Sequence, residues 1–129
     1  KHSRLAVDML PGAGDDYWEL RLLIDFLVVC LAGRFLLPAG FISDGASIRF
    51  RAVSAVIGRY GRRALLAALL HDYFYSDGRY LIPADVENPR LWCDALFFQV
   101  MIEAGVDRRL ARLAYRAVRM FGDTYWDKR

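Results

Sequence analysis

The hydrophobic period of this sequence changes once, close to Ser47. Before that point apolar and polar residues alternate, as Trp18, Leu20 and Leu22 do within residues 17–23, and this is the period of a half-buried strand. After it, apolar residues recur at the spacings of three and four that are typical of a helix. Strands followed by helices predict an α+β fold, with a small N-terminal antiparallel sheet packed on a C-terminal cluster of about four helices. A length of 129 residues predicts a single domain, 1–129.

Turn and cap residues divide the two halves into elements. Asn88 and Pro89 are typical of a helix start, Gly105 can end that helix in a left-handed conformation, and Asp107 can cap the last helix. Gly58 can end the first helix, and the second strand should be the more buried one because it is a continuous apolar run. The expected strands are residues 17–23, 26–31 and 34–37, and the expected helices are residues 47–57, 62–75, 88–104 and 107–122.

The apolar composition raises the question of a membrane span. Hydrophobic residues make up 56% of the chain, and the mean hydropathy is +0.17. The most apolar stretch, residues 20–37, is interrupted by Arg21, Asp25 and Arg34, and no run approaches the ~20 apolar residues that a spanning helix needs. We therefore expect no membrane span, and the first residues do not have the pattern of a secretory leader.

Two cysteines and two serines are candidate nucleophiles. Cys30 and Cys93 lie among large apolar residues, so we interpret them as reduced core residues of an intracellular protein. Cys93 precedes Asp94 and could be an activated thiol, but a buried inert thiol is the simpler interpretation. Ser43 and Ser47 lie near an aspartate without the sequence context of a nucleophile elbow.

Four ionisable residues lie in otherwise apolar surroundings: Asp44, His71, Asp72 and Asp94. Burying such groups is costly unless they are paired, hydrogen-bonded or bound to a metal. His71 and Asp94 fall on the inward faces of two helices that a short loop connects. We therefore expect the carboxylate of Asp94 and the imidazole of His71 to lie within hydrogen-bonding or one-water reach, with Asp44 or Asp72 as a further neighbour.

Three interpretations of this group remain open. It can be a buried hydrogen-bond network that holds the sheet to the helices. It can be a catalytic site formed by Asp44, His71, Asp72 and Asp94, in which Asp44, His71 and Asp94 would bind a metal or the carboxylates and the histidine would share acid–base work. Oxygen-rich ligation favours Mg²⁺ or Mn²⁺ over structural zinc. The third interpretation is a virion or host-interaction module whose polar network only maintains its shape.

The last expected helix carries a stripe of arginines. The chain has a formal net charge of +3 and few lysines, and arginine suits phosphates and carboxylates. The opposite stripe of this helix, expected to face the core, is Leu110, Leu113, Ala114, Ala117, Val118 and Phe121. The arginine stripe, a candidate partner surface, is Arg108, Arg112, Arg116 and Arg119. It is either a solvated face or a docking surface, and because no aromatic residues are interleaved with it we expect weak, salt-sensitive nucleic-acid binding at most.

Several motifs resemble one known family. They are residues 37–48 (LPAGFISDGASI), His71-Asp72 followed by Tyr75, Asp94 followed by Phe97, and residues 115–122 (YRAVRMFG). In this order they resemble the phage family catalogued as domain of unknown function thirteen fifty-three, over residues 17–126. The chain departs from the family pattern at residues 49–50 and at the neighbours of Asp94.

The resemblance implies a phage or prophage origin, often near tail and lysis genes, and no assigned chemistry. The expected function is therefore an accessory role in tail assembly or host-wall encounter, with phage structural proteins or the host cell wall as partners. The expected location is the host cytoplasm or the virion. The alternative is a metal-dependent hydrolase that uses the Asp/His cluster.

Overall fold

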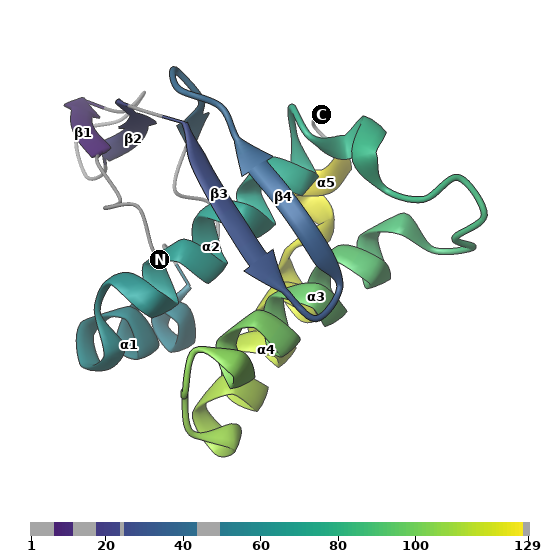
Figure 1. Ribbon diagram of the computed structural model, residues 1–129. Coiled ribbons are helices and arrows are strands. Elements are labelled where there is room, and N and C mark those ends of the chain that lie inside the picture. Colours follow the sequence, from purple (N-terminus) through teal and green to yellow (C-terminus); the bar gives the residue numbers. More distant parts are fainter. Residues whose placement is uncertain (1–6, 12–17, 24, 44–49, 128–129) are drawn as a thin grey trace.

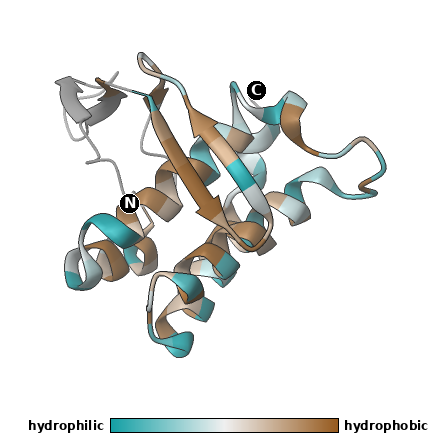
Figure 2. Ribbon diagram, viewed as in Figure 1, coloured by the Kyte–Doolittle hydropathy of each residue, from teal (hydrophilic) through white to brown (hydrophobic). Residues whose placement is uncertain are grey.

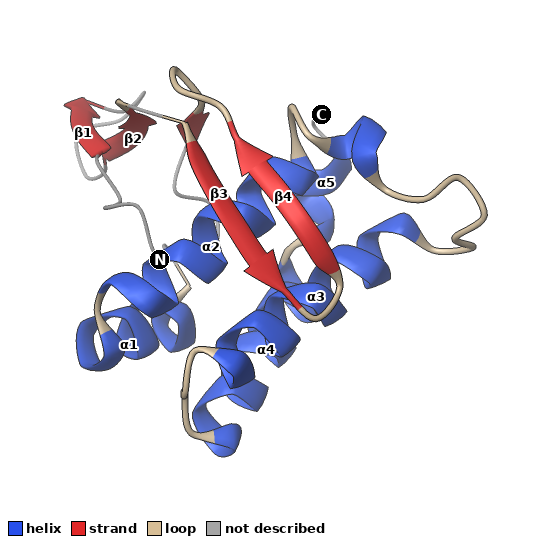
Figure 3. Ribbon diagram, in the orientation of Figure 1, coloured by secondary structure: helices blue, strands red, loops and turns tan. Residues whose placement is uncertain are grey.

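The protein has the α+β architecture that the change of period predicts (Figure 1). The computed structural model describes residues 7–11, 18–23, 25–43 and 50–127. Strands come first along the chain and helices follow, as Figure 3 shows by colour. The strands are β1 (Val7–Pro11), β2 (Trp18–Leu22), β3 (Phe26–Cys30), β4 (Gly33–Leu37) and β5 (Ile42–Ser43). The helices are α1 (Arg51–Tyr60), α2 (Arg62–Tyr75), η1 (Arg79–Leu81), α3 (Pro89–Glu103), α4 (Arg108–Phe121) and α5 (Asp123–Asp127).

The strands that the structure describes form two antiparallel sheets rather than the single one that we expected. One has the order β1-β2-β5, and the other is the β3–β4 hairpin. The hairpin alternates between its two faces: Phe26 and Val28 are buried, whereas Val29 is 64% exposed and Leu31, just past the strand, is 80% exposed. The apolar run of the second expected strand is therefore buried on one face only. A two-stranded sheet lying on helices has only one covered face.

Local sequence signals set the ends of the helices in the second half of the chain. The Asn88 side chain accepts a hydrogen bond from Leu91 N at 3.1 Å, and Pro89 occupies the first turn of α3. The Asp107 carboxylate accepts one from Arg109 N at 2.9 Å and caps α4. Gly105, between these helices, has φ +89°, a conformation that favours glycine. The predicted starts of α3 and α4 are thereby confirmed, and α2 has the predicted bounds.

Helix α1 differs from the expectation at its end. It continues through Gly58 to Tyr60, and Gly61, with φ +69°, lies in the left-handed region and separates it from α2. Two glycines three residues apart can both end a helix, so the sequence did not decide between them. The expected cap, Ser47, lies outside the described residues.

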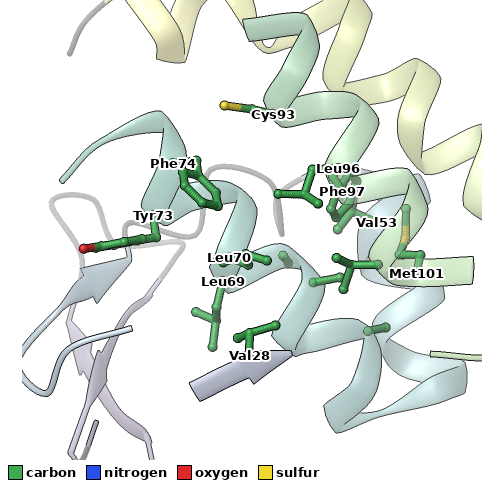
Figure 4. Close-up of a cluster of buried hydrophobic side chains, with 14 of the residues drawn as sticks. Val28, Val53, Leu69, Leu70, Tyr73, Phe74, Cys93, Leu96, Phe97 and Met101 are labelled. Atoms are coloured by element: carbon green, nitrogen blue, oxygen red, sulfur yellow. The ribbon is translucent and has the colours of Figure 1, made fainter. Parts of the chain in front are cut away.

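Helix α2 lies at the centre of the molecule and packs against α1 and α3, while α4 packs against α1 and α3. The stripe Ala64, Ala67 and Ala68 is buried, which brings neighbouring backbones close. Figure 4 shows apolar side chains of α2, among them Leu69 and Leu70, gathered with Phe97 and Met101 of α3 and Val53 of α1 in one core cluster. None of the described helices has the length and hydropathy to cross a membrane.

Candidate functional site: a buried carboxylate–imidazole cluster

Asp94 is the centre of the polar cluster. It lies on the face of α3 that packs against α2 and α4, and it is 0% exposed. Among the described residues, four side chains donate hydrogen bonds to its carboxylate. Oδ1 accepts from His71 Nε2 at 2.6 Å and from the Tyr75 hydroxyl at 2.7 Å. Oδ2 accepts from Arg119 Nη1 at 2.8 Å and from Arg90 Nη1 at 3.4 Å.

His71 lies between two carboxylates. Its Nε2 bonds to Asp94, and its Nδ1 lies 3.7 Å from Oδ1 of Asp72. The imidazole packs between the rings of Tyr75 and Phe97, at centroid distances of 4.3 and 4.8 Å. The predicted convergence of His71 and Asp94 is therefore confirmed, with Asp72 as the further neighbour. Because Nε2 faces a carboxylate, it carries the proton of this bond.

Asp72 connects the cluster to the sheet. The hydroxyl of Ser43, at the end of β5, donates to Oδ2 of Asp72 at 2.6 Å, and both residues are buried. The Ser76 hydroxyl donates to the carbonyl oxygen of Asp72 at 2.8 Å. Asp44, the fourth predicted member, lies outside the described residues, so its place in the cluster stays a prediction.

The charges in the cluster depend on one another. Burial alone would lower the pKa of His71, but the hydrogen bonds and negative charges of Asp72 and Asp94 raise it above its ordinary value. Burial alone would raise the pKa of Asp94, but the hydrogen bonds of His71, Tyr75 and Arg119 and the positive charge of His71 lower it. Burial and the charge of Asp94 raise the pKa of Tyr75, so its hydroxyl keeps its proton. Both shifts, the raised pKa of His71 and the lowered pKa of Asp94, favour the imidazolium–carboxylate form of this pair.

Arg90 joins α3 to the end of α4. Its Nη1 donates to the carbonyl oxygen of Val118 at 3.1 Å and its Nη2 to that of Arg119 at 3.0 Å. The last carbonyls of a helix lack partners within that helix. Arg90 therefore caps α4 while it also lies beside Asp94.

The structure corrects the predicted arginine stripe of α4. Arg119 is not on the partner surface with the other three, because it turns inward to Asp94 and its side chain is only 28% exposed. Arg108, Arg112 and Arg116 are exposed. The predicted core stripe is also wrong at Leu113 and Phe121, which are 52% and 56% exposed. The buried residues of α4 are Ala111, Ala114 and Val118.

Sequence reasoning did not identify Arg90, Arg119, Tyr75 or Ser43 as hydrogen-bond partners in this cluster. A signal existed for Arg90, which precedes Asp94 by four residues, and residues at this spacing are neighbours on a helix. No local signal existed for Arg119. It lies 25 residues from Asp94 and continues a regular spacing of exposed arginines.

The geometry also bears on metal and thiol chemistry. Among the described residues, no group of three or more His, Cys, Asp or Glu side chains is arranged to hold a metal ion. An ionised carboxylate has about four lone-pair sites, and Asp94 already accepts from four donors. Cys93 is buried, and burial, with the nearby charge of Asp94, raises the pKa of its thiol to about 12. Its thiolate is therefore scarce near neutral pH, as an inert core thiol requires.

Comparison with known proteins gives one match. Residues 20–118 match the model of a family described as "Protein of unknown function (DUF1353)". The matched range covers most of the chain and includes Ser43, His71, Asp72 and Asp94. No curated protein and no solved structure matches the chain.

Proposed function

The chain belongs to the DUF1353 family of proteins of unknown function, and from that premise we propose that this member is a phage or prophage accessory protein that acts by binding rather than by catalysis. Its role would be in tail assembly or in the encounter with the host wall, within the host cytoplasm or the virion. The resemblance of its motifs supports the phage setting. The geometry of the cluster supports the non-catalytic role.

The proposal rests on one observation: hydrogen-bond donors already occupy both carboxylate oxygens of Asp94. Its carboxylate is 0% exposed, and both oxygens are occupied by donors from α2, α3 and α4. A catalytic acid or base needs a free lone pair or proton within reach of a substrate. A carboxylate with every site occupied instead joins three helices. The surface would then do the binding, and the cluster would keep that surface in shape.

The test is a substitution of Asp94 with a matched control. Asp94→Ala leaves His71, Arg90 and Arg119 without their carboxylate, and removing one partner of a buried ion pair costs about 3–5 kcal/mol. Asp85→Ala removes an exposed aspartate, so it should change the free energy of unfolding by less than about 0.5 kcal/mol. Chemical denaturation of both variants measures the difference. If the Asp94 variant were as stable as the control, the cluster would not be structural.

The alternative is a metal-dependent hydrolase that uses Asp44, His71 and Asp94. One observation favours it: the His71 imidazole lies 2.6 and 3.7 Å from two carboxylates, and Ser43, which bonds to the second of them, directly precedes Asp44 in the sequence. Calorimetric titration with Mn²⁺ and Mg²⁺ distinguishes the two functions. The binding module shows no site and the same melting temperature with a chelator. Stoichiometric Mn²⁺ binding that Asp94→Ala abolishes would favour the hydrolase.

A further inference from the structure

One end of the molecule carries a concentration of exposed arginines. The turn between α1 and α2 lies against the turn between α3 and α4, because the Tyr60 hydroxyl accepts from Asp107 N at 3.0 Å and Arg63 Nη1 donates to Ala104 O at 3.5 Å. Figure 2 shows hydrophilic colour on these outer turns. We define the basic face by its exposed arginines: Arg59, Arg62, Arg63, Arg108, Arg109, Arg112 and Arg116.

The carboxylates near this face are already engaged. Asp107 accepts from the backbone of α4, and Glu103 Oε1 accepts from Leu31 N at 3.0 Å. Within the part of the chain that the structure describes, no arginine of the basic face forms an ion pair with a carboxylate. Its positive charge is therefore available to an external anion.

The side chains of the basic face suit phosphates rather than bases. Arg108, Arg112 and Arg116 follow one another at intervals of four, so their Cβ atoms lie about 6 Å apart in a row. The exposed large hydrophobic side chains of α4 are Leu113, Met120 and Phe121. Helix α4 includes no Asn, Gln, Ser or Thr, which are among the side chains that read base edges. Such a row neutralises phosphates without selecting a sequence.

We propose that the basic face binds the phosphate backbone of duplex DNA without sequence preference. This binding is independent of the proposed role of the Asp94 cluster, because Arg119, the arginine of α4 that belongs to that cluster, is not part of the face. Each neutralised phosphate releases counterions, so the affinity falls steeply with salt. With about four phosphates contacted, affinity should drop roughly 100-fold between about 50 and 200 mM salt.

The experiment is a fluorescence-anisotropy titration of a labelled duplex at several salt concentrations. Arg112→Gln and Arg34→Gln form a matched pair, since both remove one exposed arginine but only Arg112 lies on the basic face. Arg112→Gln should flatten the plot of log affinity against log salt by about 0.9, and the triple variant Arg109→Gln, Arg112→Gln, Arg116→Gln by roughly 2.7. Arg34→Gln should leave the slope unchanged. Thermal melts of each variant confirm that it is folded.

Three results would overturn the proposal. The first is no salt-dependent binding of the wild-type protein, and the second is equal effects of Arg34→Gln and Arg112→Gln. The third concerns a different occupant, a second copy of this chain, whose exposed acidic residues include Asp77, Asp85, Glu87, Asp123 and Asp127. Salt-sensitive oligomers of the protein alone, measured by sedimentation velocity and lost in the triple variant, would assign the basic face to that contact instead.

Discussion

At the scale of single residues, Asp94 shows how a charge becomes tolerable in a core. Its carboxylate is fully buried, yet donors from three helices surround it. Leaving a buried charge unpaired costs several kcal/mol. The same pairing shifts the pKa of Asp94 down and that of His71 up, so the cluster links folding to pH.

The pH dependence of stability follows from the raised pKa of His71 and the lowered pKa of Asp94. The pKa of His71 is raised in the folded protein above its ordinary value of 6.5, so its contribution is complete below that value and is lost as the pH rises towards the folded pKa. The pKa of Asp94 is lowered from 3.8, so its contribution is present above that value and is lost as the pH falls. Melting temperature should therefore be highest between these values.

A substitution of His71 separates its contribution to the pH dependence of stability from that of the other titrating groups. His71→Gln removes the titrating imidazole, so melting temperatures measured from about pH 6 to 9 should fall less with pH than those of the wild type, even though the variant is less stable throughout. A variant whose pH profile is parallel to that of the wild type above pH 6.5 would show that His71 does not carry this dependence.

At the scale of elements, the absence of a Cβ at a glycine allows side chains of neighbouring helices to approach the backbone closely. Gly122, which follows α4, has helical φ and ψ angles of −77° and −18°, so its backbone conformation accepts any residue. A Cβ there would collide with Val118 O and lie 2.9 Å from the Tyr75 hydroxyl and 3.0 Å from Arg90 Nη1. The backbone of Gly122 thus forms one wall of the polar cluster.

Gly58 and Gly122 should respond oppositely to the same substitution. Gly58 lies inside α1 and a Cβ there meets nothing within 4 Å, so Gly58→Ala should stabilise the protein by about 0.5–1 kcal/mol through helix propensity. Gly122→Ala should destabilise it by about 1–3 kcal/mol, the usual cost of overpacking. Denaturant unfolding measures both. Stabilisation by Gly122→Ala would contradict the close approach of Tyr75 and Arg90.

The sequence predicts those features that local chemistry determines. Asn88 and Asp107 mark the starts of α3 and α4 because each side chain caps its own helix, and the inward faces of His71 and Asp94 follow from helical spacing. The division into two sheets and the inward turn of Arg119 depend instead on contacts between residues far apart in the chain. The exposed outer face of the β3–β4 hairpin also lacks a local signal, since an apolar run fits a strand covered on one face or on both.

At the scale of the whole molecule, the Asp94 cluster makes three helices interdependent. His71 and Tyr75 belong to α2, Arg90 to α3 and Arg119 to α4, and all four donate to Asp94. Arg90 also caps the end of α4. Opening one of these helices alone would leave a buried charge unpaired. They should therefore open together.

Native-state hydrogen exchange tests this cooperativity. Buried amides of α2, α3 and α4 should exchange with one common opening free energy, and those of the β3–β4 hairpin with a smaller one, because the hairpin is covered on one face. Asp94→Ala should lower the values of the three helices together. If α4 opened at a free energy well below that of α2, the helices would be independent units.

The stacking of Trp126 gives the cluster an optical reporter. Trp126 lies on α5 with the guanidinium of Arg79 3.5 Å above its ring and the ring of Tyr75 edge-on at 5.1 Å. Tyr75 in turn holds its hydroxyl on Asp94. The emission of this indole senses the charge and polarity around it, so a rearrangement at the buried carboxylate reaches a fluorophore through a single intervening side chain. A spectrum recorded without any label can thus follow events in the core of this protein.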